Sequence, residues 1–364
     1  MEGKSNITSA TIFKKPLVIY KINTDKALIY AIKIIKYLLI NSNVDEIYVE
    51  NRDIIVENLV KFKESKDLDT NITEDSREGL DSTTHKIKNF DLGMTIPDIC
   101  ICLGGDGTTL WCNGLFKGYE RPPFLTFNLG TLGYTAIYPY TIYKEVLDEL
   151  YQSNKAISLE NRSMLDCKLN NLKVDTGLKR RKSDCCIVGD FEFLKQEIES
   201  QQEMTALNDI IIEKSKDSNL ISLKIFVNNE PLTIVKCDGL ILSTSTGSTA
   251  YSLSAGGSIM HHDVNAMILS AICPHSLSFR PIIFPANFNI QIKPCPNSYD
   301  KVEVVHDGRR LEKPITNNEF ITISLSNKFI EFIVLQNLVP DKDSLWKMKI
   351  IDQLGWNNAF QNYA

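Results

Sequence analysis

A glycine-rich segment with a single carboxylate, Gly104-Gly105-Asp106-Gly107-Thr108, is the part of this sequence best suited to chemistry. Glycine has no Cβ, so the backbone N–H groups of such a segment can come close to phosphate oxygens. A carboxylate among the glycines can accept a proton from an attacking hydroxyl or hold the hydroxyls of a ribose. The same residues also fit a tight turn between a strand and a helix, with Asp106 as the helix cap.

Two common phosphate-binding motifs differ from this segment. A P-loop has Lys followed by Ser or Thr after its last glycine, and the dinucleotide fingerprint reads G-x-G-x-x-G. The segment nevertheless follows an expected strand, Asp98 to Leu103. Because α/β folds bind ligands at the carboxyl ends of parallel strands, we predict a phosphate-binding turn at Gly104–Thr108.

A second segment is rich in hydroxyl groups, since seven of the eleven residues from Ser243 to Leu253 are Ser or Thr. The segment follows an expected strand, and a helix is predicted to begin at about Ser248. A helix N-terminus with hydroxyl donors would form an anion site without a lysine. Tyr251 offers an aromatic face to a base or a pyridine ring. The alternative is a low-complexity polar loop.

The elements around the first segment predict a parallel sheet covered by helices. Leu17 to Tyr20 is typical of a strand, and Thr24 is a candidate cap for the amphipathic helix that follows. Ile47 to Val49 is the next expected strand. Further along the chain, Phe124 to Asn128 predicts a strand and Tyr143 to Tyr151 a helix. A strand–helix–strand beginning implies parallel pairing.

The second half of the chain predicts a β-rich domain. Apolar and polar residues alternate in short runs such as Leu223–Val227, Phe288–Ile292 and Ile321–Leu325. Helical spacing returns at Asp341 to Gly355. We therefore expect an α/β domain over residues 1–158, completed by about 336–364, and a β-rich, nucleotide-binding domain over residues 159–335.

Two polar stretches interrupt these domains. Residues 61–94 carry many charges and little to bury, so we expect a flexible, solvated loop. Residues 170–203 include a basic run and a polar segment, Phe193 to Gln202, that has helical character. We expect a solvated insertion there, with a regulatory or anion-binding loop as the alternative.

The composition is that of a globular protein in a reducing compartment. Of the 364 residues, 43% are hydrophobic and 23% charged, and the net charge of −5 argues against broad nucleic-acid binding. No apolar run approaches the roughly 20 residues that span a bilayer, and no secretory signal is recognisable. The nine cysteines form no C-x-x-C pair, so free thiols and a cytoplasmic location are expected. The adjacent pair His261-His262 is not expected to hold a metal.

Several motifs, taken together in this order, resemble the NAD kinase family. They are Gly104–Thr108, Leu129-Gly130-Thr131-Leu132-Gly133, Asn208-Asp209, Asp238-Gly239 and Gly247-Ser248-Thr249-Ala250-Tyr251. The segment Pro274–Pro281 is similar to the eukaryotic branch. The resemblance runs from about Pro16 to Trp356, apart from the two polar stretches. It implies an ATP-dependent phosphotransferase that acts on the adenosine ribose 2′-hydroxyl of NAD to give NADP.

The resemblance also implies roles for single residues. Asp106 would be the general base for the ribose 2′-hydroxyl. Asn208 and Asp209 stand at an Asn-Glu pair that helps to hold NAD, and Asp209 is one methylene shorter than the family's Glu. Tyr134 stands where the family usually has Phe. The other residues expected at the nucleotide site are Gly105, Gly107, Thr108, Lys236, Asp238, Thr249, Ala250, Tyr251, Ser254 and Arg309.

The implied partners are NAD and ATP, with Mg²⁺ carried in by the ATP phosphates rather than by a dedicated ligand set. A homodimer or homotetramer is expected, without nucleic-acid or membrane partners. The choice between ATP and polyphosphate, and between NAD and NADH, stays open. One alternative is a diacylglycerol-type lipid kinase, which shares the Gly-Gly-Asp-Gly motif. The other is a non-catalytic NAD-sensing module, which would keep the pocket and lose the base.

Overall fold

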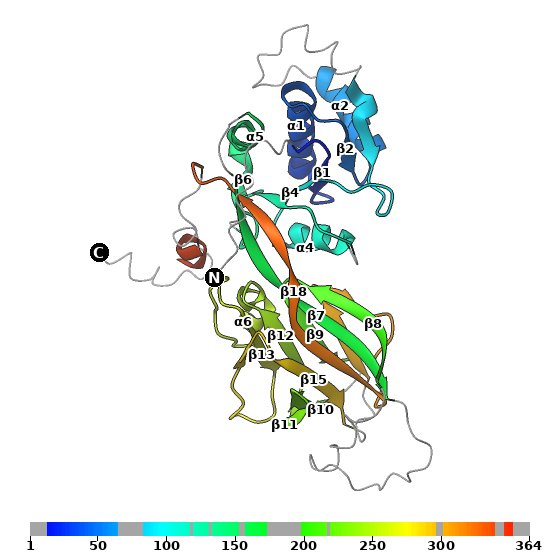
Figure 1. The fold of residues 1–364 in the computed structure, drawn as a ribbon, viewed down its shortest axis with the longest axis vertical. Coiled ribbons are helices and arrows are strands. Elements are labelled where there is room, and N and C mark those ends of the chain that lie inside the picture. The colour runs from blue at the N-terminus through cyan, green and yellow to red at the C-terminus, as the bar shows by residue number, and fades with distance from the viewer. Residues whose placement is uncertain are drawn as a thin grey trace, which may run out of the picture. The chain divides into compact units, whose positions relative to one another are not determined.

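The computed structural model describes residues 13–64, 83–116, 119–130, 133–152, 157–172, 198–216, 219–295, 301–338 and 346–351. The chain divides into two compact units. Unit 1 comprises Met1–Asn161 and Ile330–Ala364, and unit 2 comprises Arg162–Phe329. The main helices and strands of both units are labelled in Figure 1.

Unit 1 is built on a parallel sheet with the strand order β5-β4-β1-β2-β3. These strands are β1 (Pro16–Tyr20), β2 (Ile47–Val49), β3 (Ile87–Asn89), β4 (Ile99–Leu103) and β5 (Phe124–Asn128). The residues of β2, β4 and β5 are all buried. Continuous apolar runs of this kind are typical of parallel strands that are covered on both faces.

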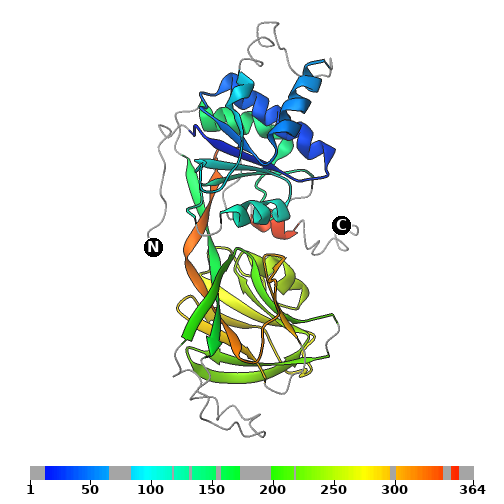
Figure 2. The ribbon, with the colours of Figure 1, turned by 90° about the vertical axis from the view of Figure 1, so that its right-hand side faces the viewer.

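Helices cover both faces of this sheet, with α4 below it and the other long helices above it in Figure 2. The helices are α1 (Asp25–Asn41), α2 (Arg52–Glu64), α4 (Asp106–Leu115) and α5 (Tyr143–Tyr151), with 3₁₀ turns η1 (Thr84–Lys86) and η2 (Tyr140–Ile142). Thr24 is the N-cap residue of α1, and the apolar face of α1 is buried. The predicted strand–helix–strand beginning and the α/β class are confirmed.

The expectation of a loop over residues 61–94 was wrong at both ends. Helix α2 continues to Glu64, and η1 and β3 occupy part of the stretch before Asp91. Ile55 and Leu59 of α2 and Ile87 of β3 are buried. Few apolar residues are therefore enough to fix these short elements against the sheet. Residues 65–82 lie outside the described residues.

The end of the chain returns to unit 1, as predicted. Residues 346–351 are helical, and Ile350 is buried. The Nζ of Lys349 donates a hydrogen bond to the carbonyl oxygen of Tyr134 at 2.8 Å. Phe332 near the end of β18 (Glu319–Val334) pairs with Phe124 of β5. The rest of the expected helix from Asp341 to Gly355 lies outside the described residues.

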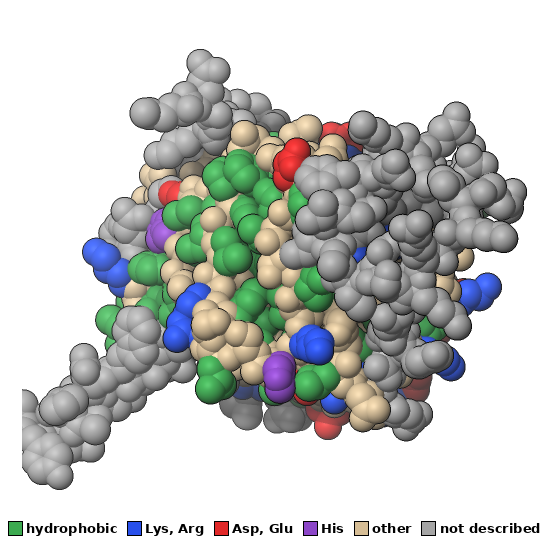
Figure 3. Space-filling view, turned by 90° about the horizontal axis from the view of Figure 1, so that it is seen from below, with side chains coloured by type: hydrophobic (Ala, Val, Ile, Leu, Met, Phe, Trp, Pro, Cys, Tyr) green, Lys and Arg blue, Asp and Glu red, His purple; other side chains and the backbone are tan. Residues whose placement is uncertain are grey.

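Unit 2 contains a six-stranded antiparallel sheet with the order β14-β13-β12-β9-β16-β17. These strands are β9 (Asp209–Lys214), β12 (Gly239–Thr244), β13 (Ala266–Ile272), β14 (Ile282–Pro285), β16 (Val302–His306) and β17 (Arg309–Arg310). Strand β14 lies at an edge of this sheet. One face of unit 2 shows many apolar side chains with single, scattered basic ones (Figure 3).

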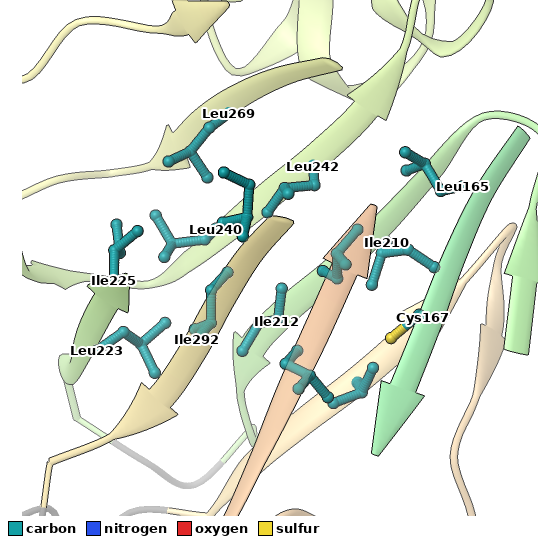
Figure 4. Packing of buried hydrophobic residues seen from close by; sticks show 14 of the residues in the cluster. Leu165, Cys167, Ile210, Ile212, Leu223, Ile225, Leu240, Leu242, Leu269 and Ile292 are labelled. Atoms are coloured by element: carbon teal, nitrogen blue, oxygen red, sulfur yellow. The ribbon is translucent and has the colours of Figure 1, made fainter. Parts of the chain in front are cut away.

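The other strands of unit 2 pair antiparallel, and together the strands enclose an apolar core. They are β7 (Ser158–Leu172), β8 (Ile198–Ala206), β10 (Ile221–Val227), β11 (Glu230–Cys237), β15 (Asn289–Pro294) and most of β18. Leu223 and Ile225 of β10 and Ile292 of β15 point toward Leu240 and Leu242 of β12 in Figure 4. Alternate residues of a strand face this core, as Ile210 and Ile212 of β9 and Leu240 and Leu242 of β12 do, so the predicted β-rich class is confirmed.

The expected insertion at residues 170–203 was wrong at both ends as well. Residues 170–172 belong to β7 and residues 198–203 to β8, with Asn171 paired to Glu199. The Nδ2 of buried Asn170 donates to the Oγ1 of Thr322 at 3.0 Å. The helix expected over Phe193–Gln202 is a strand from Ile198 onward, because pairing with β7 satisfies the backbone of this polar segment. Residues 173–197 lie outside the described residues.

We predict that residues 173–197 can be deleted, whereas residues 170–203 cannot. Leu172 pairs directly with Ile198, so a short Gly-Ser bridge between them closes a hairpin without removing a paired residue. The larger deletion removes a length of both strands and the Asn170 hydrogen bond. Thermal unfolding followed by circular dichroism should show a native-like transition for the first variant and a lower or absent one for the second. Loss of folding in the smaller deletion would contradict this interpretation.

Candidate functional site

The glycine-rich segment forms the turn from β4 into α4, as predicted. Asp106 is the first residue of α4, and Gly105 precedes it in an extended conformation. A Cβ built on Gly105 or Gly107 would meet nothing within 4 Å. The first N–H groups of a helix have no acceptor within it, and the helix dipole adds positive charge there. The turn is therefore open to a ligand and suited to an anion.

The carboxylate of Asp106 is held by the loop that follows β5. Its Oδ2 accepts the backbone N–H of Tyr134 at 2.9 Å, and its Oδ1 accepts the N–H of Thr135 at 2.8 Å and the hydroxyl of Thr135 at 2.6 Å. A carboxylate offers about four acceptor positions, so one position on Oδ2 is left for a further donor. The arrangement gives a fixed carboxylate that can still accept a proton.

Gly133 makes this arrangement sterically possible. A Cβ at this position would lie 2.5 Å from Oδ1 of Asp106, far inside contact distance. The last glycine of the Leu129–Gly133 motif is therefore explained by its close approach to the carboxylate. Sequence analysis missed Thr135, because nothing in the sequence pairs residue 135 with residue 106. The only available signal was its position just after the motif.

Two lysines hold the same loop from either side. The Nζ of Lys26 donates to the carbonyl oxygen of Leu129 at 3.1 Å and lies 4.0 Å from the ring centroid of Tyr140. Lys349 donates to the carbonyl oxygen of Tyr134 from the C-terminal segment. Burial, and then the charge of Asp106, raises the pKa of Tyr134 to about 12, so its hydroxyl stays protonated. Tyr134 can thus serve as an uncharged ring beside the carboxylate.

A pocket of about 280 Å³ in unit 1 adjoins the glycine turn. Its lining residues come from the end of β1, the glycine turn and α4, and they are Tyr20, Lys21, Ile22, Gly105, Gly107, Thr108 and Trp111. The indole Nε1 of Trp111 donates to Oε1 of Glu50 at 2.7 Å. The pocket therefore combines backbone donors, one lysine and an apolar wall.

In unit 2, the carboxylate of Asp307 fixes the turn that carries Asn208 and Asp209. It accepts the backbone N–H groups of Leu207 at 2.7 Å, Asn208 at 2.8 Å and Asp209 at 3.4 Å. Asp307 and Gly308 have positive φ angles of 45° and 76° between β16 and β17. This is the conformation that an Asp-Gly pair favours in a two-residue hairpin. The carboxylate therefore links this hairpin turn to residues 207–209.

The hydroxyl-rich segment packs directly on the same turn. A Cβ on Gly247 would lie 2.0 Å from the carbonyl oxygen of Asn208, so only glycine fits there. The Oγ1 of Thr244 donates to the carbonyl oxygen of Leu207 at 2.6 Å and accepts the N–H of Gly247 at 3.0 Å. The close approach of Gly247 to Asn208 and the hydrogen bond from the Thr244 side chain to Leu207 thus hold the two segments together.

The structure differs from the expected helix N-terminus with free hydroxyl donors, because the helix is short and three of the hydroxyls donate to backbone carbonyl oxygens. The Oγ of Ser245 donates to the carbonyl oxygen of His262 at 3.1 Å, and that of Ser248 to the carbonyl oxygen of Ser245 at 2.6 Å. The Oγ1 of Thr249 donates to the carbonyl oxygen of Thr246 at 3.0 Å. The helix itself is only a 3₁₀ turn, Gly247–Thr249, followed by the short α6, Tyr251–Ser254. The hydroxyls stabilise the loop, and so short a helix aligns few peptide dipoles.

Acidic side chains gather around Asp209 and Tyr251. Asp209 is only 5% exposed, and burial together with the charge of Asp307 raises its pKa to about 7. Burial also raises the pKa of Asp307, but three backbone N–H groups and the charge of Arg309 oppose that rise. Burial and the charges of nearby groups, Asp209 and Asp238 among them, raise the pKa of Tyr251. The structure thus brings Asp209, Asp238 and Tyr251, three of the residues predicted at the nucleotide site, close together.

Asp238 is held by an ion pair, and the other predicted residues of this part of unit 2 are more exposed. The Oδ1 of Asp238 forms an ion pair with the Nζ of Lys214 at 2.8 Å. Lys236 is exposed on β11, and its carbonyl oxygen accepts the N–H of His275 at 2.8 Å. Ser254 is exposed at the end of α6, and Ala250 is half-buried just before that helix.

His261, His262 and Asp263 form a further cluster in unit 2, with ligand atoms within 4.8 Å of one another. The two rings stack with centroids 4.2 Å apart. The Nδ1 of His261 accepts the backbone N–H of Asp263 at 3.2 Å, which uses the lone pair that a metal would need at this atom. Ring stacking and this bond account for the position of His261.

Replacing Asp209 with Asn should remove a pH dependence of stability. Because the folded pKa of about 7 lies above the ordinary value of 3.8 for an aspartate, this carboxyl stabilises the fold at low pH, and that contribution is lost as the pH rises through 7. Between pH 5 and pH 8 the loss is on the order of 3 kcal/mol. Thermal unfolding should therefore show a smaller fall in Tm over this range for Asp209→Asn than for wild type. Equal falls in both proteins, with exposed Asp25→Asn as the control, would rule this out.

Comparison with known proteins identifies the family. Residues 17–155 match the model of the ATP-NAD kinase N-terminal domain, and residues 207–335 match that of the ATP-NAD kinase C-terminal domain. Probable NAD kinase 1 of Oryza sativa subsp. japonica is 34% identical over 69% of this chain and 42% of its own length. The mitochondrial NADH kinase pos5 of Schizosaccharomyces pombe is 32% identical over 72% and 60%, respectively. The chain therefore spans about half the length of these curated relatives.

Solved structures agree with these matches. The crystal structure of yeast NADH kinase complexed with NADH has a TM-score of 0.75 and 25% identity, and the likeness covers 98% of this chain and 92% of that chain. An NAD kinase from Archaeoglobus fulgidus in complex with ATP has a TM-score of 0.51 and 20% identity over 76% of this chain and 96% of that chain, a likeness of fold alone. Because the two family models match most of the chain in the expected order, this chain belongs to the ATP-NAD kinase family.

Proposed function

We propose that this protein is an NAD kinase that transfers the terminal phosphoryl group of ATP to the adenosine ribose 2′-hydroxyl of NAD. The observation that carries the proposal is the fixed carboxylate of Asp106 at the N-terminus of α4, with one acceptor position left on Oδ2. Membership of the ATP-NAD kinase family supports it. A lipid kinase is disfavoured, since the matching models cover both halves of the chain.

Asp106 is the proposed general base. It takes the proton from the 2′-hydroxyl as the oxygen attacks the phosphorus, and a base within hydrogen-bond reach contributes about 10²–10⁴-fold to the rate. The N–H groups at Gly105 and Gly107 and the dipole of α4 stabilise negative charge on the transferred group. Phosphoryl transfer depends mostly on such positioning and charge neutralisation.

The residues of unit 2 are proposed to hold NAD. Asn208 and Asp209 stand at the positions that hold NAD in the family, and Tyr251, 40% exposed, offers a ring face. A carboxyl with a pKa of about 7 exists in both protonation states near neutral pH, so Asp209 can accept or donate a hydrogen bond to a ribose hydroxyl. The proposed nucleotide-contacting residues are Gly105, Gly107, Thr108, Tyr134, Asn208, Asp209, Lys236, Asp238, Thr249, Ala250, Tyr251, Ser254 and Arg309.

Mg²⁺ is proposed to arrive with ATP. Asp106 has three of its acceptor positions occupied, and Asp238 is paired with Lys214. Among the described residues, neither carboxylate belongs to a group of three His, Cys, Asp or Glu side chains that could hold a metal ion. Mg²⁺ commonly keeps its waters and binds through substrate phosphates, which fits these residues. The ion would neutralise phosphate charge during the transfer.

A homodimer or homotetramer is also proposed, and unit 2 carries the surface that supports it. Strand β14 is a sheet edge, Ile283 on it is 50% exposed, and nearby Leu277 is 90% exposed. Exposed apolar groups beside an open edge favour association with another chain. A monomeric mass in light scattering at micromolar concentration would contradict this proposal.

The described cysteines support a cytoplasmic location. Cys100, Cys102, Cys112, Cys167, Cys237, Cys273 and Cys295 are free thiols. Free thiols are typical of reducing compartments. In the described ranges, no helix is long and apolar enough to cross a membrane. Relatives include mitochondrial proteins, so fractionation of cells is the measurement that decides.

The proposed function predicts that the purified protein converts NAD and ATP to NADP, and that Asp106→Asn lowers kcat by roughly 10²–10⁴-fold. The KM for NAD should change little. An NADP-specific dehydrogenase measures the product, and Asp25→Asn, at the start of α1, is the matched control.

Circular dichroism is needed beside the kinetics, because Asn offers one acceptor oxygen where Asp106 uses two. A folded Asp106→Asn variant with near-normal kcat would disprove the base assignment. A wild-type protein that binds NAD without turnover would instead favour an NAD-sensing module.

A further inference from the structure

The pocket beside the glycine turn has an apolar wall that a phosphate chain does not need. Of its lining residues, Ile22 is 61% exposed and Trp111 is 46% exposed, and Tyr20 lies between burial and exposure. Phosphate groups are held by N–H donors and positive charge, which Gly105, Gly107 and Lys21 supply. The aromatic and aliphatic residues point to a second, flat and apolar part of the ligand.

The indole ring of Trp111 is fixed at one edge. Its Nε1 donates to Oε1 of Glu50, the residue that follows β2, at 2.7 Å. Burial, and then the charge of Glu50, raises the pKa of Tyr20. A partly exposed aromatic ring with a fixed orientation presents a face at little cost in conformational entropy.

The spacing along α4 relates this ring to the glycine turn. Gly107 and Trp111 are four residues apart in one helix, so they lie on the same face and about 6 Å apart along the axis. A nucleoside places its base and its first phosphate on either side of one ribose. One ligand can therefore contact both the turn and the indole within the same pocket.

We propose that this pocket binds the nucleoside part of the phosphoryl donor, with Trp111 as the stacking surface and Glu50 as the residue that positions it. Lys21 would neutralise phosphate charge, and the triphosphate would run toward the turn at Gly105–Gly107. This inference rests on the kinase function proposed above and assigns the base of the nucleoside triphosphate donor to the face of Trp111. Inorganic polyphosphate has no base and would leave the apolar wall unused.

The test compares Trp111→Ala with Tyr119→Ala. Tyr119 is 49% exposed in the same unit and does not line the pocket, so it is a matched control. Stacking of a base on an aromatic ring contributes about 1–3 kcal/mol, so Trp111→Ala should raise the KM for ATP roughly tenfold or more. The KM for NAD and kcat should stay within about twofold. Tyr119→Ala should leave all three constants unchanged.

Glu50 is tested by a pair of variants. Glu50→Ala removes the acceptor for the indole and should raise the KM for ATP by about threefold or more, with kcat unchanged. Glu50→Gln keeps a carbonyl oxygen at this position and should restore most of the affinity. Equal effects of Ala and Gln would contradict the positioning role.

Two inhibitors separate stacking from a general disturbance of the site. Trp111→Ala should weaken inhibition by ADP and leave inhibition by inorganic tripolyphosphate unchanged, because only ADP carries a base. Equal weakening of both, or an unchanged KM for ATP in an active Trp111→Ala enzyme, would overturn the inference. If the wild-type protein does not phosphorylate NAD, the proposed function fails, and calorimetric binding of ADP to wild type and Trp111→Ala then decides the inference by itself.

Discussion

The hydrogen bonds from residues 134 and 135 to the carboxylate of Asp106 are the interaction on which the proposed chemistry depends. They fix a charged group at a helix N-terminus, where it would otherwise be free to rotate into solvent. Strand β4 brings Asp106 to the edge of the sheet, and strand β5 brings the loop beside it. Gly133 leaves room for the carboxylate, and Lys349 holds the loop from the C-terminal segment. Strand β4, strand β5, the loop after β5 and the C-terminal segment of unit 1 thus all help to position the Asp106 side chain.

Unit 2 also contains a carboxylate that accepts several backbone N–H groups, and there the carboxylate holds a structural turn. The carboxylate of Asp307 also accepts consecutive backbone N–H groups, those of residues 207–209. Its three bonds all come from backbone N–H groups of this turn, so its role is to hold the turn in place. The consequence is the burial of Asp209 beside a second carboxylate, which raises the pKa of Asp209 to about 7. A structural turn therefore sets the protonation of a proposed NAD-binding residue.

Sequence reasoning predicted the elements that bury continuous or regularly spaced apolar residues. Strands Ile47–Val49 and Phe124–Asn128 and helix Tyr143–Tyr151 have the predicted bounds. The predictions failed for segments that a few buried apolar residues, or backbone pairing alone, hold in place. Helix α2 buries Ile55 and Leu59 among charged residues, and β8 consists largely of polar residues whose backbone pairs with β7. Whether such segments form a helix or a strand depends on tertiary pairing, which no local pattern reveals.

The same contrast between local pattern and tertiary structure applies to the residues of the candidate site. Motif resemblance indicated Asp106, Asn208 and Asp209, because their residue types and order are specific. The sequence could not show that the hydroxyls near Ser248 donate to nearby carbonyl oxygens rather than outward, since a sequence lists donors without their acceptors. Thr135 and Asp307 act on residues about 30 and 100 positions away, which places their roles beyond local pattern.

The central claim is that the Asp106 carboxylate works because the loop holds it, and the hydroxyl of Thr135 tests this most directly. Thr135→Ser keeps the donor to Oδ1, whereas Thr135→Val removes it with little change in volume. Hydrogen bonds to a charged group contribute about 1.5–3 kcal/mol. The account predicts kcat within about twofold of wild type for Thr135→Ser and about tenfold or more lower for Thr135→Val, with the KM for NAD unchanged in both. Wild-type kcat in a folded Thr135→Val protein would contradict it.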